Sequence, residues 1–323
     1  MTHDSPPDSR DGPILLCVGA DAAIAARLAE AVVPLLTARP AVVLSTWSPP
    51  PVMGPGYEAV MDALSDTQAE LRAAARHAAC DPASAACDVL DAHGLDVTRR
   101  VHSDDCSPWR VILDVADEID AAVIVAGTHE DPGARPGKLG REARALAHRS
   151  RRPLLLLAPD NVPADPGATA IFAYDGSASA DHAIQAAAAL LRPRPALVAC
   201  AWHSAAHTIG VAMLAVSEAV ARKGGEELDE ASRSAAESHA RDAAAQLSGA
   251  GWACDTAAVR TTRNAAAAII VAAEDHEAAV IVTGTRGRSR IAAALLGSTA
   301  EGIARHAGRP ELLVPSNAQQ ASG

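Results

Sequence analysis

The sequence predicts an α/β protein made of two consecutive copies of one parallel-sheet domain. An internal repeat shows this most directly: VIVAGT at 123–128 matches VIVTGT at 280–285, and the same offset pairs Gly140 with Gly297. Within each copy, short apolar runs typical of strands alternate with alanine-rich segments typical of helices. This alternation predicts a doubly wound parallel sheet with helices on both faces. The strands are apolar along their whole length, as strands buried on both faces are.

The first copy comprises residues 13–159. It opens with the apolar run 14–21, which ends in a turn, and continues into the alanine-rich helical segment 22–36. The other expected strands are 41–47, 95–101, 123–128 and 153–159. A long helix is expected between the second and third strands, a helix containing 111–119 between the third and fourth, and a last helix before the fifth.

The second copy comprises residues 169–316 and repeats this order. Its opening strand begins at Ile171 and leads into the helical segment 180–191. The other expected strands are 196–202, 254–260, 280–285 and 311–315, and one helix contains 268–276. Between the copies, PDNVPADPGAT at 159–169 has the composition of a linker, so we expect two tandem domains.

Composition excludes several classes of function. Aromatic residues make up 2% of the chain and the formal net charge is −11, so a nucleic-acid partner is not expected. No apolar run approaches the roughly 20 residues of a membrane span, and the polar N-terminus does not resemble a signal peptide. We therefore expect no membrane partner and a cytoplasmic location. The scattered cysteines lack a CxxC pair and are expected to be reduced thiols: 17, 80, 87, 106, 200 and 254.

A glycine-rich segment follows the predicted strand 280–285. Gly284 and Gly287 stand at the carboxyl end of that strand, and Gly297-Ser298-Thr299 opens the next helix. In a doubly wound sheet, ligands bind at this end of the strands. Glycines there allow backbone N–H groups to approach an anion, and the helix start adds hydroxyl donors and a positive dipole end. Glycines at such turns also serve backbone geometry alone, but the spacing G-x2-G-x9-G-S favours a phosphate site.

This spacing, with Asp175 closing the first strand of the same copy, resembles the ATP-binding subclass of the universal stress protein family. The resemblance covers nearly the whole chain, as a tandem of two such domains. It implies Rossmann-like five-stranded parallel sheets of order 3-2-1-4-5, with ATP, alone or with Mg²⁺, at the carboxyl edge. The glycines and Ser298 would hold the phosphates, while Asp175 and the backbone near Ala201 would hold ribose and adenine. The implied binding residues are Asp175, Gly176, Ala201, Thr283, Gly284, Arg286, Gly287, Gly297, Ser298 and Thr299.

The resemblance also implies how the copies associate. Related single-domain proteins dimerise through their last strand, so 154–158 and 312–315 are expected to pair inside one chain, as a pseudo-dimer. Exposed apolar sheet edges favour such pairing. Further pairing of whole chains into a homodimer stays open.

The first copy departs from the binding pattern in three places. Glu130 stands where the second copy has Gly287, Arg141 replaces Ser298, and Val18 replaces Asp175. A carboxylate in a phosphate loop is electrostatically adverse, although Arg141 can offset it in part. We therefore expect one ATP per chain, bound in the second copy.

Other motifs are weaker evidence of a binding or catalytic site. GARPGKL at 133–139 lacks the Ser or Thr that follows the lysine of a P-loop. Arg286, Arg288 and Arg290 are explained equally well as phosphate contacts or as a solvated basic rim. The histidines show no metal-binding spacing, and no catalytic set can be assembled, so neither a metal site nor a catalytic residue is assigned.

Three functions remain open. The leading hypothesis is a non-catalytic stress or signalling protein in which ATP changes the conformation or the surface offered to an unknown protein partner. A slow ATPase or phosphotransferase would need a water-orienting carboxylate, and none occurs between Gly284 and Thr299. The third hypothesis is a nucleotide-free interaction scaffold.

Overall fold

The structure is a computed structural model of the 323-residue chain. It describes residues 12–47, 65–103, 107–129, 138–158, 165, 167–204, 218–261, 263–287 and 296–316. Most of the predicted linker at 159–169 and most of 133–139 lie outside this range, as do Glu130, Arg288 and Arg290.

The first half contains every element expected for it. In chain order these are β1 (Ile14–Val18), α1 (Ala22–Leu35), β2 (Ala41–Trp47), α3 (Ser65–Ala92), β3 (Val97–Ser103), α4 (Pro108–Glu118), β4 (Val123–Gly127), α5 (Arg141–Arg149) and β5 (Leu154–Leu157). The second half repeats them as β6 (Ala170–Ala173), α6 (Ala178–Leu190), β7 (Ala196–His203), α8 (Glu218–Gly249), β8 (Cys254–Thr261), α9 (Ala265–Asp275), β9 (Val280–Gly284), α10 (Ser298–His306) and β10 (Glu311–Val314).

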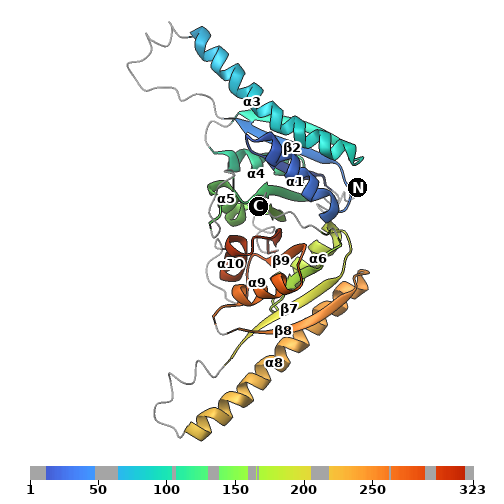
Figure 1. Cartoon of the computed structure of the whole chain (residues 1–323), viewed down its shortest axis with the longest axis vertical. Coiled ribbons are helices and arrows are strands. Elements are labelled where there is room, and N and C mark those ends of the chain that lie inside the picture. Colours follow the sequence, from blue (N-terminus) through green and yellow to red (C-terminus); the bar gives the residue numbers. More distant parts are fainter. Residues whose placement is uncertain are drawn as a thin grey trace, which may run out of the picture.

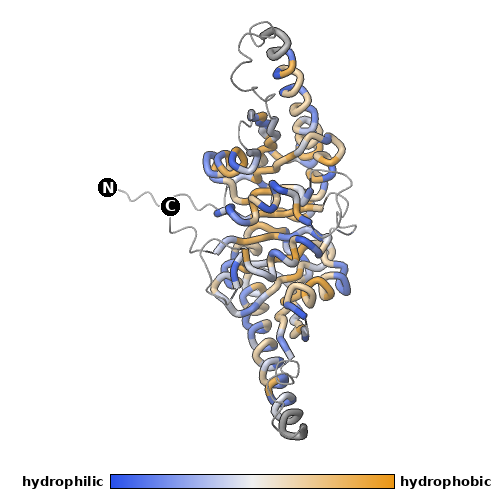
Figure 2. Tube along the Cα trace, turned by 90° about the vertical axis from the view of Figure 1, so that its left-hand side faces the viewer, coloured by the Kyte–Doolittle hydropathy of each residue, from blue (hydrophilic) through white to orange (hydrophobic). Residues whose placement is uncertain are grey.

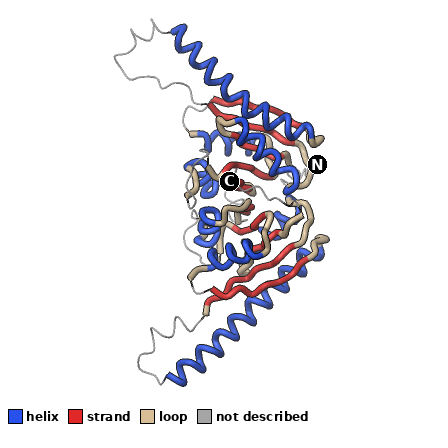
Figure 3. The backbone as a smooth tube through the Cα atoms, viewed as in Figure 1, coloured by secondary structure: helices blue, strands red, loops and turns tan. Residues whose placement is uncertain are grey.

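The strands of both halves form one sheet of ten strands, in the order β3-β2-β1-β4-β5-β10-β9-β6-β7-β8. Each half therefore has the predicted order 3-2-1-4-5, and its strands are parallel. The strands of the two halves lie in the middle of the molecule, between the projecting helices α3 and α8 (Figures 1 and 3). The halves join because β5 pairs with β10 in antiparallel register, Leu155 opposite Leu312. The predicted contact between the last strands is confirmed, and it merges the two sheets into one.

A second seam joins the halves where α1 and α6 end. The backbone N–H of Thr37 donates to the carbonyl of Leu190 at 2.8 Å, and that of Arg192 donates to the carbonyl of Leu35 at 2.9 Å. The two bonds are reciprocal, as a twofold relation between the halves requires. In Figure 1 the halves accordingly lie end to end, and α3 and α8 project at opposite ends of the molecule.

Helices cover both faces of the sheet. One face packs against α1, α3, α6 and α8 in a single apolar cluster that runs through both halves. The other face has two clusters: one under α4 and α5 that also takes in Ala300 of α10, and one under α9 and α10. Figure 2 shows apolar residues running through the middle of the molecule, with more polar residues on the outer helices. Ala, Val, Leu and Ile make up most of these clusters, because the chain has few aromatic residues.

Two further expectations concern the described part of the chain. None of its helices is both long and apolar enough to cross a membrane. Its five cysteines form no disulfide with one another: Cys17, Cys80, Cys87, Cys200 and Cys254. Burial raises the pKa of the Cys17 thiol, which disfavours the reactive thiolate.

Candidate nucleotide site

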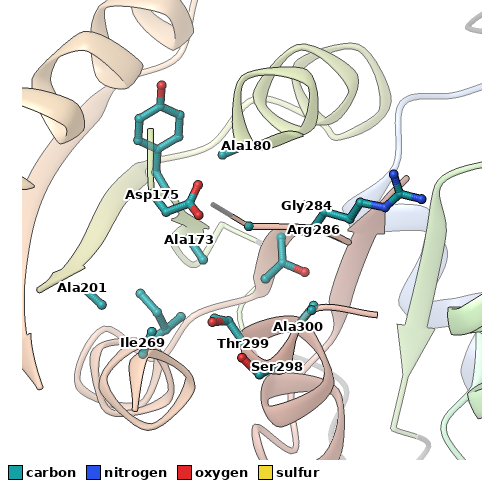
Figure 4. Close-up of a pocket in the computed structure, with 15 residues that line it drawn as sticks. Ala173, Asp175, Ala180, Ala201, Ile269, Gly284, Arg286, Ser298, Thr299 and Ala300 are labelled. Carbon is teal, nitrogen blue, oxygen red and sulfur yellow. The ribbon is translucent and has the colours of Figure 1, made fainter. Parts of the chain in front are cut away.

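A cavity of about 200 Å³ opens at the carboxyl ends of β6, β7 and β9 (Figure 4). Nine of the ten residues predicted to bind ATP line it: Asp175, Ala201, Thr283, Gly284, Arg286, Gly287, Gly297, Ser298 and Thr299. The tenth, Gly176, is not among the lining residues. Its φ of +76° lies in the left-handed region, and a Cβ there would come within 2.8 Å of the His239 ring. Gly176 is therefore explained by the turn after β6 and by this close approach.

Asp175 follows the end of β6 and forms one wall of the cavity. Its Oδ1 accepts a hydrogen bond from the backbone N–H of Ser177 at 3.0 Å, which fixes the turn into α6. Its Oδ2 faces the glycine loop, because a Cβ built on Gly287 would lie 3.0 Å from it. The carboxylate is thus held by the backbone on one side and directed toward the loop on the other.

Each of the three loop positions is occupied by glycine for a different physical reason. A Cβ on Gly284 would lie 2.9 Å from the backbone oxygen of Ser179 in α6, so packing of that helix alone requires glycine there. A Cβ on Gly297 would lie 3.2 Å from the carbonyl of Thr285. A Cβ on Gly287 would meet only the end of the Asp175 side chain, 3.0 Å away. A side chain at this position would therefore fill the open space of the cavity. Of the three, Gly287 is the one whose smallness keeps the cavity open.

The start of α10 supplies the polar end of the cavity. Gly297 is the N-cap and donates its N–H to the carbonyl of Thr285 at 2.7 Å, and Ser298 and Thr299 follow in the first turn. A glycine N-cap has no side chain that could accept a hydrogen bond from the first N–H groups of the helix. By contrast, Asp21, Ser177 and Asn264 cap α1, α6 and α9 in this way. The start of α10 therefore presents N–H groups and two hydroxyls to the cavity, as an anion site requires.

Part of the cavity lining is apolar, and the sequence analysis missed most of it. This part consists of Ala173, Ala265 and Ile269 together with the predicted Ala201. Ala265 and Ile269 come from the first turns of α9, whose apolar residues look like ordinary core residues in the sequence. Their place in the chain could have indicated a role in the cavity, because α9 begins just after β8, next to the end of β7.

Arg286 lines the cavity, but its side chain points away from Asp175 and toward the first half in Figure 4. Arg288 and Arg290 lie outside the described residues.

One lining residue connects the cavity to the seam between the halves. Thr283 on β9 forms a 2.9 Å hydrogen bond with Oε1 of Glu311 on β10, and Glu311 stands opposite Leu156 of β5. Glu311 is 1% exposed and its Oε2 has no partner. Burial raises the pKa of the Glu311 carboxyl well above its ordinary value, and the bond from Thr283 offsets this only in part. Sequence reasoning missed this buried acid.

The first half has a related cavity of about 80 Å³, lined by Val18, Gly127, Gly140 and Glu142 among others. Val18 offers no acceptor where the second half has Asp175. Arg141 donates from Nη2 to Oε1 of Glu142 at 2.8 Å. Glu142 occupies the position that Thr299 has in the second half, so a carboxylate replaces a hydroxyl at this helix start.

The fold and this pair of cavities define a duplicated, doubly wound α/β protein. A model of the universal stress protein family matches residues 12–158 and again residues 169–315, so the chain belongs to the universal stress protein family. The family resemblance inferred from the sequence is thereby confirmed.

Two solved structures show the same tandem fold. A protein of unknown function from Pseudomonas aeruginosa PAO1 is 16% identical with a TM-score of 0.55, covering 97% of this chain and 96% of that one. A universal stress protein from Archaeoglobus fulgidus DSM 4304 is 14% identical with a TM-score of 0.54, covering 94% of this chain and 98% of that one. A comparison with curated proteins finds no match.

Proposed function

We propose that the chain is a cytoplasmic stress-response protein that binds one ATP, in the cavity of its second half, and acts without rapid turnover. The observation that carries this proposal is the convergence of four features on one cavity. Asp175, Gly287 and the hydroxyls of Ser298 and Thr299 surround its polar end, and the uncapped start of α10 adds N–H donors.

The lining residues fit the parts of a nucleotide. The start of α10 would accept the phosphates, as helix N-termini do. Asp175 would accept hydrogen bonds from the ribose hydroxyls, and the apolar part around Ala201 and Ile269 would contact the base. A Mg²⁺ ion that accompanies ATP would take its ligands chiefly from phosphate oxygens and water.

The proposal favours regulation over catalysis. Phosphoryl transfer requires a group that orients the nucleophile near the phosphates. Among the described lining residues Asp175 is the one carboxylate, and its Oδ1 already accepts from the backbone of Ser177. Bound ATP would instead contact α10 and, through Thr283, the strand that joins the halves. This route could carry a conformational signal to a protein partner.

Two measurements test the proposal. Mass spectrometry of small molecules released from the denatured, purified chain should detect ATP, and calorimetric titration of the nucleotide-free chain should give one site per chain. If neither detects ATP binding, the chain is a nucleotide-free scaffold. Steady-state phosphate release is expected to stay below about 1 per second, the low end of ordinary enzyme turnover. A faster rate would establish an ATPase in its place.

A further inference from the structure

The cavity of the first half has the wrong charge for a phosphate. Its described lining residues include two carboxylates, Asp21 and Glu142, and no lysine or arginine. The positive end of α5 contributes only about half a unit charge there, so the described lining side chains are net negative, and Arg141 offsets part of this charge from the solvent side through its bond to Glu142. A ligand of this cavity is expected to be cationic.

Glu142 supplies an unmet hydrogen-bond acceptor in this lining. The residue is 8% exposed. Its Oε1 accepts from Nε and Nη2 of Arg141 at 3.2 and 2.8 Å, while its Oε2 is buried without a partner. The side chain of Arg141 is 84% exposed and therefore lies on the solvent side of this pair. A buried carboxylate oxygen that lacks a partner is costly, so a donor from a ligand would be stabilising.

A second unmet polar atom lies in the same cavity. His129 follows β4, and its Nδ1 lies 3.1 Å from Oγ1 of Thr128. The Nε2 atom of the same ring is buried without a partner. Both His129 and Thr128 line the cavity. The ring can therefore offer a polar contact to the same ligand.

We propose that the first-half cavity binds a small organic cation, a primary ammonium group on a short alkyl chain. The ammonium would donate to Oε2 of Glu142, and Leu28, Ile112 and Leu146 would contact the alkyl part. A single water needs about 10–15 Å³ of such space, so about 80 Å³ has room for a handful of non-hydrogen atoms. A metal ion fits less well, because no group of three or more His, Cys, Asp or Glu side chains that could hold one occurs among the described residues.

The test uses the full chain and n-butylammonium chloride, titrated calorimetrically against a sodium chloride blank. The wild-type chain should bind one butylammonium. Glu142→Gln keeps the shape and removes the charge, and it should weaken binding about tenfold to a hundredfold, the effect of losing a hydrogen bond to a charged group. Glu30→Gln, an exposed acid on α1 of the same half, is the matched control and should bind like wild type.

A second measurement needs no variant. In ¹⁵N-labelled wild-type chain, butylammonium should shift the imidazole signals of His129 and leave those of the exposed His93 unchanged. The proposal is wrong if wild type gives only the heat of the salt blank, as it would if water alone fills the cavity. It is equally wrong if Glu142→Gln binds as well as wild type, or if inorganic phosphate binds here in place of butylammonium.

Discussion

The two cavities lie at equivalent places in equivalent domains and differ in polarity. In the second half, α10 begins with Ser298 and Thr299, and Asp175 faces the glycine loop. In the first half, α5 begins with Arg141 and Glu142. The backbone that forms the site is retained, while the hydroxyls of Ser298 and Thr299 at the start of α10 are replaced by the Arg141–Glu142 ion pair at the start of α5. The change of ligand class that we propose between the halves therefore needs only a few side chains, because the stability of the duplicated fold depends on the cores elsewhere.

The comparison also separates glycines that serve the fold from the one that serves the cavity. Gly140 and Gly297 are equivalent, and a Cβ on either would come within 3.1 or 3.2 Å of a carbonyl oxygen of the preceding loop. A side chain at either position would thus be a tight fit in both halves, whatever they bind. Gly287 faces only the flexible carboxylate of Asp175. Substitution of Gly287 should therefore affect ligand binding more, and folding less, than substitution of the other loop glycines.

The largest effect is expected from Gly287→Glu, which places the first half's acid in the second half. The Cβ of the new side chain would lie 3.0 Å from Asp175 Oδ2, and the added carboxylate would repel both Asp175 and the phosphates. Losing two or three contacts to charged groups weakens binding by roughly two to six powers of ten. Calorimetric titration with ATP should therefore show no binding.

The matched control for this change is Gly249→Glu. It adds the same charge at the end of α8, where a Cβ would meet nothing within 4 Å. This control should bind ATP like wild type. If Gly287→Glu still binds ATP, the second-half cavity is not the nucleotide site.

A smaller loss, of about a hundredfold in ATP affinity, is expected from Thr299→Glu. This change removes one donor to the phosphates and adds the negative charge that Glu142 carries in the first half. Thr299→Ser keeps the hydroxyl and should bind within a few-fold of wild type. Equal losses in both variants would mean that packing of Thr299, rather than its charge and hydroxyl, determines the effect.

The sequence predicted the fold well and the site in part, for identifiable reasons. Continuous apolar strands and one constant offset were enough for the tandem parallel α/β domains, while the strand order and the β5–β10 contact were predicted from the family resemblance. Ile269 was missed because an apolar residue that lines a cavity looks like one that fills a core. Glu311 was missed because its burial depends on a strand from the other half. Glu142 could have been found, since the offset that paired Arg141 with Ser298 also pairs the next two residues.

The buried acid Glu311 allows a test of the seam between the halves. The first half has apolar residues at the positions equivalent to Thr283 and Glu311, namely Ala126 and Leu154. Burial raises the folded-state pKa of the Glu311 carboxyl above its ordinary 4.5, so the folded chain keeps a proton that the unfolded chain releases. Stability is therefore lost as the pH rises from about 4.5 toward that raised pKa. Glu311→Gln should be more stable than wild type at pH 8, by an amount that shrinks toward pH 5.

Urea unfolding at both pH values measures this difference, and the exposed Glu274→Gln serves as the control that should not change it. An advantage of Glu311→Gln that is equal at pH 5 and pH 8 would show that the folded and unfolded chains hold the same number of protons at Glu311 over this range, so that burial does not raise its pKa.

The smallest effect on ATP affinity is expected from the reverse exchange, Arg141→Ser with Glu142→Thr. The double variant gives α5 the hydroxyls of α10, but Val18 still offers no acceptor, and the cavity stays smaller, at about 80 Å³ against about 200 Å³. Glu130 also remains in the loop. A titration should still report one ATP per chain, while butylammonium binding should be lost with the Glu142 carboxylate. A second ATP site in this variant would mean that the two helix-start residues alone determine which ligand each half takes, and that Val18 and Glu130 contribute little.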